Sequence, residues 1–405
     1  MRFAISTVGT RGDVQPYIAL SRGLQEWGHT VTLASHPCMR ALVEAHGVPF
    51  APIGPDVDVG KAAAAIRGRS RNWLLSFIRV MQFTVSTIEQ ASPDLLRLCR
   101  EAEVVIVSHS FAGAAEADKL GKLTVSVTLQ HQAIPTPDPS RPILKRAMRA
   151  IVGRAMGMIM VRPYNRLRGK IGAPRVADIE DMMSAQLNLL PISPRVVSRD
   201  PRWGPQHRLT GYWFLDQLQR WTPPADLQAF LAVGEPPIAI TLGAMSLGAG
   251  ADALESVQLI LNAVRQAQVR AIVQGWDDVI PALDLPPTVH HAGSMPHSWL
   301  FERVSCVVHH GGFGTTATTL RAGVPAVVIP HIIDQLFWGE RVHALGVGPA
   351  AIPRAKLSVD SLAQALNRAT QDRAMRTRAA ELGAQIRDET GVQNAAQWIE
   401  DATRG

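Results

Sequence analysis

Two glycine-containing segments carry the residues whose types and spacing best suit chemistry. The first is Gly9-Thr10-Arg11-Gly12-Asp13, and the second is His309-His310-Gly311-Gly312-Phe313-Gly314-Thr315-Thr316. The second lies between an expected strand and an expected helix. Glycines let a backbone approach a ligand closely, and the free N–H groups at a helix start suit a phosphate. The segment therefore predicts an anion site, to which an imidazole and the hydroxyls of Thr315 and Thr316 would add donors.

Other interpretations of both segments stay open. Neither the P-loop spacing G-x-x-x-x-G-K-[ST] nor the dinucleotide fingerprint G-x-G-x-x-G occurs in the second segment. That segment is also compatible with a tight strand-to-helix turn whose histidines are buried. Asp13, expected at the end of the first strand, is equally a residue type that caps a helix.

Asp334 and Gln335 form a third candidate group, in a loop expected after the strand 326–329. The carboxyl ends of parallel strands meet at one edge of a sheet, so we expect this pair near the phosphate site. A carboxylate next to an amide can bind sugar hydroxyls. The alternative is a solvated acid in a loop.

Strands that alternate with helices must position these residues, which predicts parallel sheets built from βαβ units. The fold class expected is α/β, with two Rossmann-like, doubly wound domains and a ligand cleft between their carboxyl edges. The expected strands are 2–8, 30–34, 48–53, 104–107, 123–128, 186–190, 238–242, 270–273, 288–291, 306–309 and 326–329. Helices are expected at 14–27, with Pro16 in the first turn, and at 253–266 and 392–402. The domains expected are 1–215, a linker 216–235, a second domain 236–385, and a C-terminal helix within 386–405.

Composition excludes several classes of protein. The 405 residues are 46% hydrophobic and 19% charged, which excludes a mainly disordered chain. Three widely spaced cysteines exclude a disulfide framework and a CxxC metal cluster. The thirteen histidines form no H-E-x-x-H motif, and Asp56-Val57-Asp58 is expected to be a solvated loop. No signal peptide and no apolar run of ~18 residues is seen, so we expect a cytoplasmic protein.

The net charge of +7 comes from one segment. Residues 141–170 hold nine basic side chains and no acid, so the rest of the chain sums to −2. A second basic and apolar stretch, 67–83, includes Trp73 and Phe77. We hypothesise that both stretches line a pocket for a lipid-like alcohol and allow that alcohol to be drawn from an anionic membrane surface, the alternative being a solvated helix face. No nucleic-acid motif accompanies these charges.

Several motifs together resemble the GT-B-fold UDP-glycosyltransferases. They are residues 309–316, Ala322-Gly323-Val324-Pro325 and Asp334-Gln335-Leu336-Phe337-Trp338-Gly339. The N-terminal segment 9–20, with 296–301 and 341–349, is similar to the sterol 3-beta-glucosyltransferase branch, and glycopeptide-antibiotic transferases share a shorter version of it. Residues 60–200 show little of the likeness.

The resemblance implies roles for individual residues. Asp13 would be the catalytic base, and His310 would bind the donor's diphosphate together with Gly312, Gly314 and Thr315. Asp334 and Gln335 would hold the sugar. No metal and no cofactor is implied beyond the nucleotide sugar.

The resemblance also implies where the base of the nucleotide would bind. Ser294, Met295 and His297 would contact it, and Ser294 stands where many relatives have a stacking Trp. Trp276 and Trp299 are the candidate replacements, or simply core residues. Ala244 replaces a common Ser, which leaves Ser246 as its substitute.

The function expected is therefore inverting transfer of a sugar, glucose by resemblance, from a UDP-sugar to a hydroxyl of a hydrophobic acceptor such as a sterol. One alternative is a dTDP-deoxysugar transferase that acts on an antibiotic aglycone or glycolipid. A UDP-sugar 2-epimerase, which shares a similar two-domain scaffold, is a further alternative.

Overall fold

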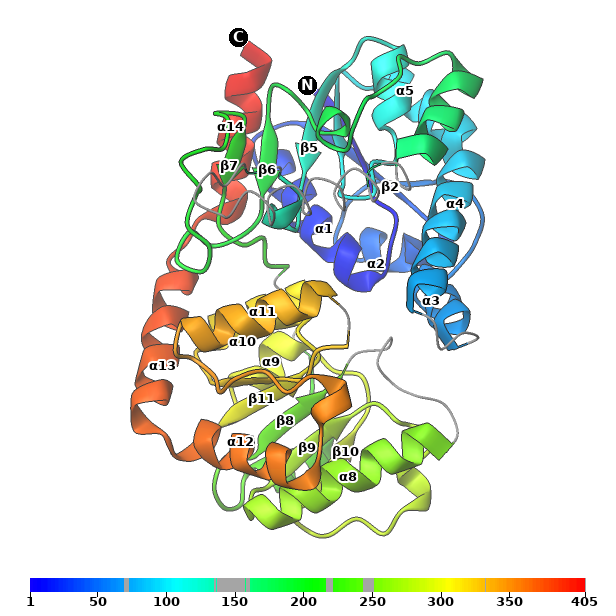
Figure 1. Cartoon of the computed structure of the whole chain (residues 1–405). Coiled ribbons are helices and arrows are strands. Elements are labelled where there is room, and N and C mark those ends of the chain that lie inside the picture. Colours follow the sequence, from blue (N-terminus) through cyan, green and yellow to red (C-terminus); the bar gives the residue numbers. More distant parts are fainter. Residues whose placement is uncertain are drawn as a thin grey trace, which may run out of the picture. The chain divides into compact units, whose positions relative to one another are not determined.

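The chain folds into two compact units (Figure 1). The computed structural model describes residues 1–68, 73–134, 136, 157, 161–215, 221–242, 251–331 and 333–404. The first unit comprises Met1–Leu215 and Thr390–Gly405, and the second comprises Asp216–Glu389. Each is built around its own parallel sheet, which confirms the expected fold class.

The first unit has a seven-stranded sheet in the order β3-β2-β1-β4-β5-β6-β7. Its strands are β1 (Arg2–Ser6), β2 (Thr30–Ser35), β3 (Phe50–Pro52), β4 (Val104–Val107), β5 (Leu123–Val127), β6 (Asn188–Leu190) and β7 (His207–Leu209). Its helices are α1 (Arg11–Glu26), α2 (Arg40–Glu44), α3 (Val59–Gly68), α4 (Trp73–Glu101), α5 (Ala114–Lys119) and α14 (Gly391–Arg404), and residues 161–171 are also helical. All four β4 residues are buried, as expected of a strand covered on both faces.

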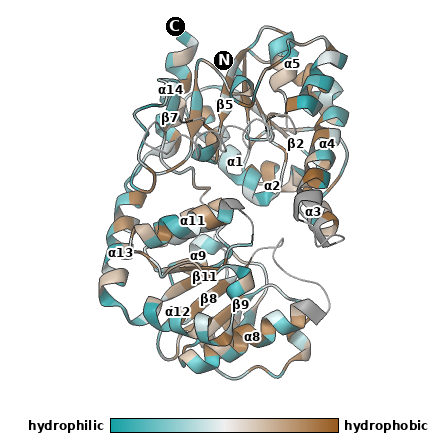
Figure 2. Cartoon of the chain, viewed as in Figure 1, coloured by the Kyte–Doolittle hydropathy of each residue, from teal (hydrophilic) through white to brown (hydrophobic). Residues whose placement is uncertain are grey.

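The second unit has a five-stranded sheet in the order β10-β9-β8-β11-β12. Its strands are β8 (Ile238–Thr241), β9 (Ala271–Gln274), β10 (Val289–Ala292), β11 (Cys306–His309) and β12 (Ala326–Val328). Its helices are α7 (Ala225–Leu231), α8 (Ala251–Ala267), α9 (His297–Phe301), α10 (Phe313–Ala322), α11 (Ile333–Ala344), α12 (Val359–Gln371) and α13 (Arg373–Arg387). Figure 2 shows apolar residues concentrated on strands such as β8 and β11, whose residues are buried.

Strand order fixes where ligands are expected in each unit. From β1 the chain moves outward to β2 and β3, then returns to place β4 on the other side of β1. From β8 it moves to β9 and β10, then returns to place β11 beside β8. Ligands of such sheets bind beyond the carboxyl ends of the strands at this reversal. The candidate residues after β1, β4 and β11 all stand at these two reversals.

The differences from the sequence expectation include two helix starts and one strand. Helix α1 begins at Arg11 rather than Val14, so Pro16 lies inside the helix instead of in its first turn. The short strand β7 was not expected. Helix α11 begins at Ile333, so Asp334 and Gln335 lie in the first turn of a helix and not in a loop.

The C-terminal helix α14 belongs to the first unit. The indole Nε1 of Trp213 donates to the carbonyl of Gly391 at 3.1 Å, and the Asn394 amide donates to the carbonyl of Thr210 at 2.9 Å. Glu400 Oε1 lies 3.0 Å from His29 Nε2. These contacts fasten both ends of the helix to the first sheet and to its neighbouring connections.

The basic stretches are only partly described. Residues 141–156 and 158–160 lie outside the described part of the chain, as do residues 69–72 of the earlier stretch. Where the second stretch is described, Arg168 is buried and pairs with Asp118, and Lys170 pairs with Glu89. Arg168 is therefore a buried cation paired with Asp118, and not the surface cation that the sequence suggested. Within the described ranges, no helix is both long and apolar enough to cross a bilayer.

Candidate active site

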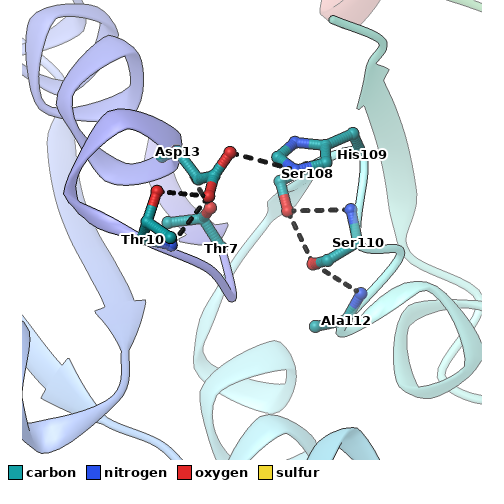
Figure 3. A network of polar contacts seen from close by, with 7 residues as sticks. All are labelled: Thr7, Thr10, Asp13, Ser108, His109, Ser110 and Ala112. Atoms are coloured by element: carbon teal, nitrogen blue, oxygen red, sulfur yellow. Dashed lines mark hydrogen bonds and ion pairs between the residues drawn. The ribbon is translucent and has the colours of Figure 1, made fainter. Parts of the chain in front are cut away.

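Asp13 lies in the first turn of α1, directly beyond β1 (Figure 3). Its Oδ2 atom accepts hydrogen bonds from the Thr10 backbone N–H at 2.7 Å and from Thr10 Oγ1 at 2.8 Å. A Cβ atom at Gly9 would lie 2.4 Å from the same oxygen, so only glycine admits the carboxylate there. Thr10 is thus the N-cap residue of α1, and Asp13 is the third helical residue, which accepts the Thr10 N–H in a capping box. Asp13 supports the helix start in this way, but it neither precedes a helix that begins at Val14 nor ends the strand. Its second oxygen points away from the cap.

The partner of that second oxygen is His109, which sequence reasoning missed. His109 Nε2 lies 3.5 Å from Asp13 Oδ1. The two side chains keep 33% and 28% of their surface exposed, so the pair is accessible to a substrate. The Nδ1 atom of His109 is buried without a hydrogen-bond partner among the described residues. The available signal was positional, because His109 follows β4 as Asp13 follows β1, and these strands are neighbours.

The loop that carries His109 is held in a fixed shape. Ser108 Oγ and Ser110 Oγ are 2.7 Å apart, and Ser110 Oγ accepts from the Ala112 N–H at 3.4 Å (Figure 3). Ser6 Oγ donates to the Ala112 carbonyl, and Tyr164 donates its hydroxyl to the Ser110 carbonyl. Phe111, between them, has a φ of 56°, which is rare outside glycine. Such strain persists only where surrounding contacts impose it, so the loop presents His109 in one orientation.

In the second unit, the glycine segment turns from β11 into α10. Gly311 has a φ of 87°, and Gly312 is the N-cap residue without a side-chain cap. The first N–H groups of α10 therefore have no partner within the helix. Thr316 is buried, and its hydroxyl donates to the Gly312 carbonyl at 2.9 Å. The expectation that this hydroxyl would donate to a ligand was therefore wrong. Thr315 is half-buried and Gly314 is exposed in the first turn.

Three imidazoles surround this turn. A Cβ at Gly312 would lie 2.3 Å from His310 Nε2, so the His310 ring covers the glycine closely. His309 is fully buried, and its Nδ1 accepts the Gly311 N–H at 3.0 Å. That bond places the His309 proton on Nε2. The Nε2 of His309, Nδ1 of His310 and Nε2 of His331 are all buried without a hydrogen-bond partner within the described ranges.

Burial keeps these rings neutral. It lowers the pKa of His310 to about 4 and that of His309 to about 3. Burial also lowers the pKa of His331 to about 4, helped by the nearby charge of Arg354 and by the neighbouring His310. A neutral imidazole carries one N–H donor and one acceptor, so at neutral pH each ring offers a hydrogen bond instead of a full charge.

The residues expected to hold the sugar are only partly described. The Gln335 side chain is buried, and its Oε1 accepts the His331 N–H at 2.8 Å across the start of α11. Asp334 lies in the same turn, but its side chain is outside the described part, and Ser246 lies wholly outside it. The structure thus places Gln335 beside His331.

The expected base-binding loop follows β10. Ser294 is exposed, whereas Met295 is buried in the core with Leu300 and Phe301. His297 Nε2 lies 3.1 Å from Gln274 Oε1, and the His297 ring stacks on Phe301. Packing holds Met295 in place, and a hydrogen bond and ring stacking hold His297. Ser294 stays accessible.

Gln274, at the end of β9, is another residue that sequence reasoning missed. Besides its bond to His297, its Nε2 donates to the Gly293 carbonyl at 3.2 Å. Gln274 therefore ties together both ends of the loop between β10 and α9. Trp276, one of the proposed stacking residues, is 4% exposed within the core. Trp299, the other, packs against Trp221 and the Arg303 guanidinium.

Over the residues that the structure describes, no three His, Cys, Asp or Glu side chains gather as a metal site requires. Asp58 Oδ1 accepts the Lys61 N–H at 3.0 Å, and both aspartates of the D-x-D sequence are exposed. That sequence is a local turn at the start of α3.

Comparisons with known proteins identify the fold and the family of the chain. Residues 3–117 match the family described as glycosyltransferase family 28 N-terminal domain, and residues 260–400 match the erythromycin biosynthesis protein CIII-like C-terminal domain. The solved glycosyltransferase of kitacinnamycin superposes with a TM-score of 0.76 over 99% of this chain and 98% of its own, at 21% identity. The glycosyltransferase VinC, solved in complex with DTDP, superposes with a TM-score of 0.74 over the full length of both chains, at 19% identity. The fold is therefore that of the two-domain GT-B proteins.

Similar sequences extend this result to a family. O-mycaminosyltylonolide 6-deoxyallosyltransferase of Streptomyces fradiae is 31% identical over 99% of this chain and 97% of its own. A sterol 3-beta-glucosyltransferase of Arabidopsis thaliana is 31% identical over 97% of this chain and 66% of its own. The chain belongs to the glycosyltransferase family that contains these proteins. It spans about two thirds of the length of the plant sterol relatives, and 29% of that of a Sclerotinia sclerotiorum relative.

Proposed function

We propose that this protein is an inverting glycosyltransferase that moves a sugar, glucose in the first instance, from a UDP-sugar to a hydroxyl of a hydrophobic acceptor such as a sterol. The single observation that carries the proposal is the uncapped start of α10 beneath His310. A diphosphate fits this helix start because its first N–H groups have no partner within the helix and its end is positive. The buried imidazole beside it also has a nitrogen without a partner among the described residues.

Asp13 is the catalytic base in this proposal. Its Oδ1 takes the proton of the acceptor hydroxyl as that oxygen forms a bond to the anomeric carbon. His109 Nε2, 3.5 Å away, accepts this proton from Asp13 when the nitrogen carries no hydrogen of its own, and the imidazolium that results then pairs with the restored carboxylate. The pair resembles the carboxylate–imidazole couple of other acid–base sites. Attack on the face opposite the leaving group inverts the anomeric centre.

The second unit binds the leaving group. As the bond between the anomeric carbon and the phosphate oxygen breaks, its electron pair stays on the diphosphate. The N–H groups at the start of α10 and the His310 ring donate to the phosphate oxygens, where negative charge develops in the transition state. Gly312, Gly314 and Thr315 line this turn, and Asp334 and Gln335 hold the sugar hydroxyls. Gln335 is preorganised by its bond to the His331 N–H.

The base of the nucleotide binds at the loop between β10 and α9. Ser294 contacts the base directly, and Gln274 holds the loop through Gly293 and His297. Met295 supports the loop from the core. Ser246 is the proposed further contact from the connection after β8.

A second candidate function is transfer of a dTDP-deoxysugar to an antibiotic aglycone or glycolipid. The observation in its favour is the match to the S. fradiae 6-deoxyallosyltransferase along nearly the whole of both chains. Acceptor choice depends on pocket shape, which a fold does not supply.

A panel of donors crossed with a panel of acceptors, read by product mass, tests both candidates. UDP-glucose with sterols supports the first and dTDP-deoxysugars with macrolide aglycones support the second. A glycosylated product whose anomeric configuration matches that of the donor contradicts inversion. Release of an epimer from UDP-sugar alone contradicts both candidates.

We further propose a cytoplasmic enzyme that contacts the inner membrane surface peripherally through 67–83 and 141–170, from which it draws its acceptor. Sedimentation with vesicles containing anionic lipid tests this at low and high salt. Binding that salt reverses supports membrane contact, and absence of binding at low salt contradicts it.

A further inference from the structure

Arg354 is a cation of the second unit with an unused donor. It begins the short 3-10 turn η5 (Arg354–Lys356), and its backbone N–H donates to the Pro330 carbonyl at 3.2 Å. Its Nη2 donates to Ser256 Oγ in α8 at 2.5 Å. Its Nη1 is buried and has no hydrogen-bond partner among the residues described, and no carboxylate of that set pairs with it. A buried guanidinium donor without an acceptor costs stability, so its position needs an explanation.

The surroundings of Arg354 lie at the carboxyl edge of the second sheet. Ile352 donates its N–H to the Val328 carbonyl at 2.9 Å, so the segment leading to Arg354 runs beside the end of β12. Ile329 in turn donates to the His309 carbonyl at 2.8 Å, which joins the ends of β12 and β11. The three strand-end segments that carry Arg354, His331 and His310 are thus neighbours in this sheet.

The unpartnered nitrogens described at this edge suit the same kind of ligand. His309 contributes a buried Nε2–H, and His310, His331 and Arg354 each contribute a buried nitrogen without a partner in the part of the chain that the structure describes. The backbone bonds from Arg354 to Pro330 and from Ile329 to His309 bring the segments of these residues together, and the pKa of His331 is lowered by burial and then by nearby Arg354 and His310. Several nitrogens without an oxygen between them form an incomplete network, and a multiply charged oxyanion would complete it.

Arg354 also supplies a full positive charge, which the histidines and the helix start of this site do not. The histidines of the turn are neutral at pH 7, as argued above from their lowered pKa values. The start of α10 contributes only a partial positive charge. A diphosphate carries more than one negative charge, and a permanently charged guanidinium is the group that binds phosphate oxygens with directional hydrogen bonds.

We propose that Arg354 binds a phosphate oxygen of the donor's diphosphate through Nη1, with Ser256 orienting the guanidinium. The proposal rests on the proposed nucleotide-sugar function and adds a residue to it. Arg354 neutralises the departing diphosphate, a task that is otherwise left to the helix end and neutral imidazoles. Ser256 is a positioning residue, because it acts through Arg354.

Calorimetric titration of the full chain with UDP and with uridine tests the proposal. Arg354→Gln is expected to weaken UDP binding by about 10-fold or more and to leave uridine binding unchanged, because uridine has no phosphate. Lys356→Gln is the matched control, since Lys356 is exposed in the same turn; it should bind UDP like the wild type.

Ser256→Ala provides a second variant in case Arg354→Gln does not fold. It keeps the charge and removes only the orienting hydroxyl, and we expect a smaller loss of UDP affinity, about 3-fold, again without change for uridine. If Arg354→Gln or Ser256→Ala, folded by circular dichroism, binds UDP as the wild type does, the inference is overturned while the function stands. A folded wild type that binds neither UDP nor dTDP contradicts the proposed function itself.

Discussion

Asp13 and His109 stand on two different strand-to-helix connections of the first unit, yet Oδ1 of one lies 3.5 Å from Nε2 of the other. The parallel pairing of β1 with β4, from Phe3 opposite Val104 to Ser6 opposite Val107, ends both strands at the same level. The reversal of strand order between them leaves their connections facing each other. The pairing of the two strands therefore brings the Asp13 carboxylate and the His109 imidazole together.

Asp13→Asn is expected to lower kcat by about 10²- to 10⁴-fold, because the amide cannot take the acceptor's proton. The substitution keeps an oxygen for the Thr10 N–H, so the helix cap survives and Tm should change little. Steady-state transfer assays with thermal unfolding of the same samples measure both quantities.

Thr10→Val separates capping from catalysis. It removes the 2.8 Å bond from Oγ1 and keeps the backbone bond. We expect about 1 kcal/mol lower stability and far less loss of kcat than in Asp13→Asn. Full activity in Asp13→Asn would reject the base assignment.

His109→Asn is expected to lower kcat by about 10- to 100-fold and to change the pH profile of kcat/KM, because Asp13 loses the ring that shares its proton. A merely structural role would lower Tm and leave the profile's shape intact. His46→Asn is the control, since the His46 ring, just after α2, bonds to the Leu42 carbonyl of that helix and lies outside both sites. An unchanged profile in His109→Asn would contradict the shared-proton role.

The fold was predictable because many strands of both sheets coincide with short apolar runs in the sequence. Strands such as β4 and β8 are buried on both faces, and glycine turns separate them from helices. The start of α1 was missed because Thr10 and Asp13 form a cap around glycines, where no apolar periodicity marks a helix. The same holds for Asp334 and Gln335, which follow a proline and open α11.

The site was predictable only where a motif is local. Asp13 and the segment around His310 stand out by their neighbours in sequence. His109, Tyr164, Gln274 and Arg354 do not, because their contacts join residues 19 to 98 positions apart. Strand order decides these contacts, and apolar periodicity does not encode strand order. The burial that lowers the pKa of the histidines is likewise a property of the folded sheet.

Gly312→Ala is expected to raise the donor KM by about 10-fold or more, because the new Cβ would lie 2.3 Å from His310 Nε2 and must displace the ring from the start of α10. Titration with UDP should show the same loss of affinity. Gly169→Ala is the control, a glycine outside both sites whose added Cβ meets no atom within 4 Å. Unchanged UDP affinity in Gly312→Ala would show that the His310 ring does not contribute to binding.

Stability is expected to fall as the pH drops from about 6.5 to 4, partly because of the buried histidines. The pKa of His309 is about 3 in the folded chain, against ~6.5 in an unfolded one, so in this window the unfolded state binds more protons. The stabilisation by neutral His309 is therefore complete above pH 6.5 and is lost progressively toward pH 3. Lowering the pH from 7.5 to 5 should cost about 2 kcal/mol through this residue.

His309→Gln isolates that contribution, since its side-chain oxygen still accepts the Gly311 N–H and the residue cannot be protonated. Urea unfolding of the second unit at pH 7.5 and pH 5 measures it. We expect the drop in unfolding free energy between the two pH values to be about 2 kcal/mol smaller in His309→Gln than in the wild type. Equal drops in both proteins would mean that His309 is accessible to protons in the folded state, and that the turn from β11 into α10 is open to water rather than sealed by the sheet.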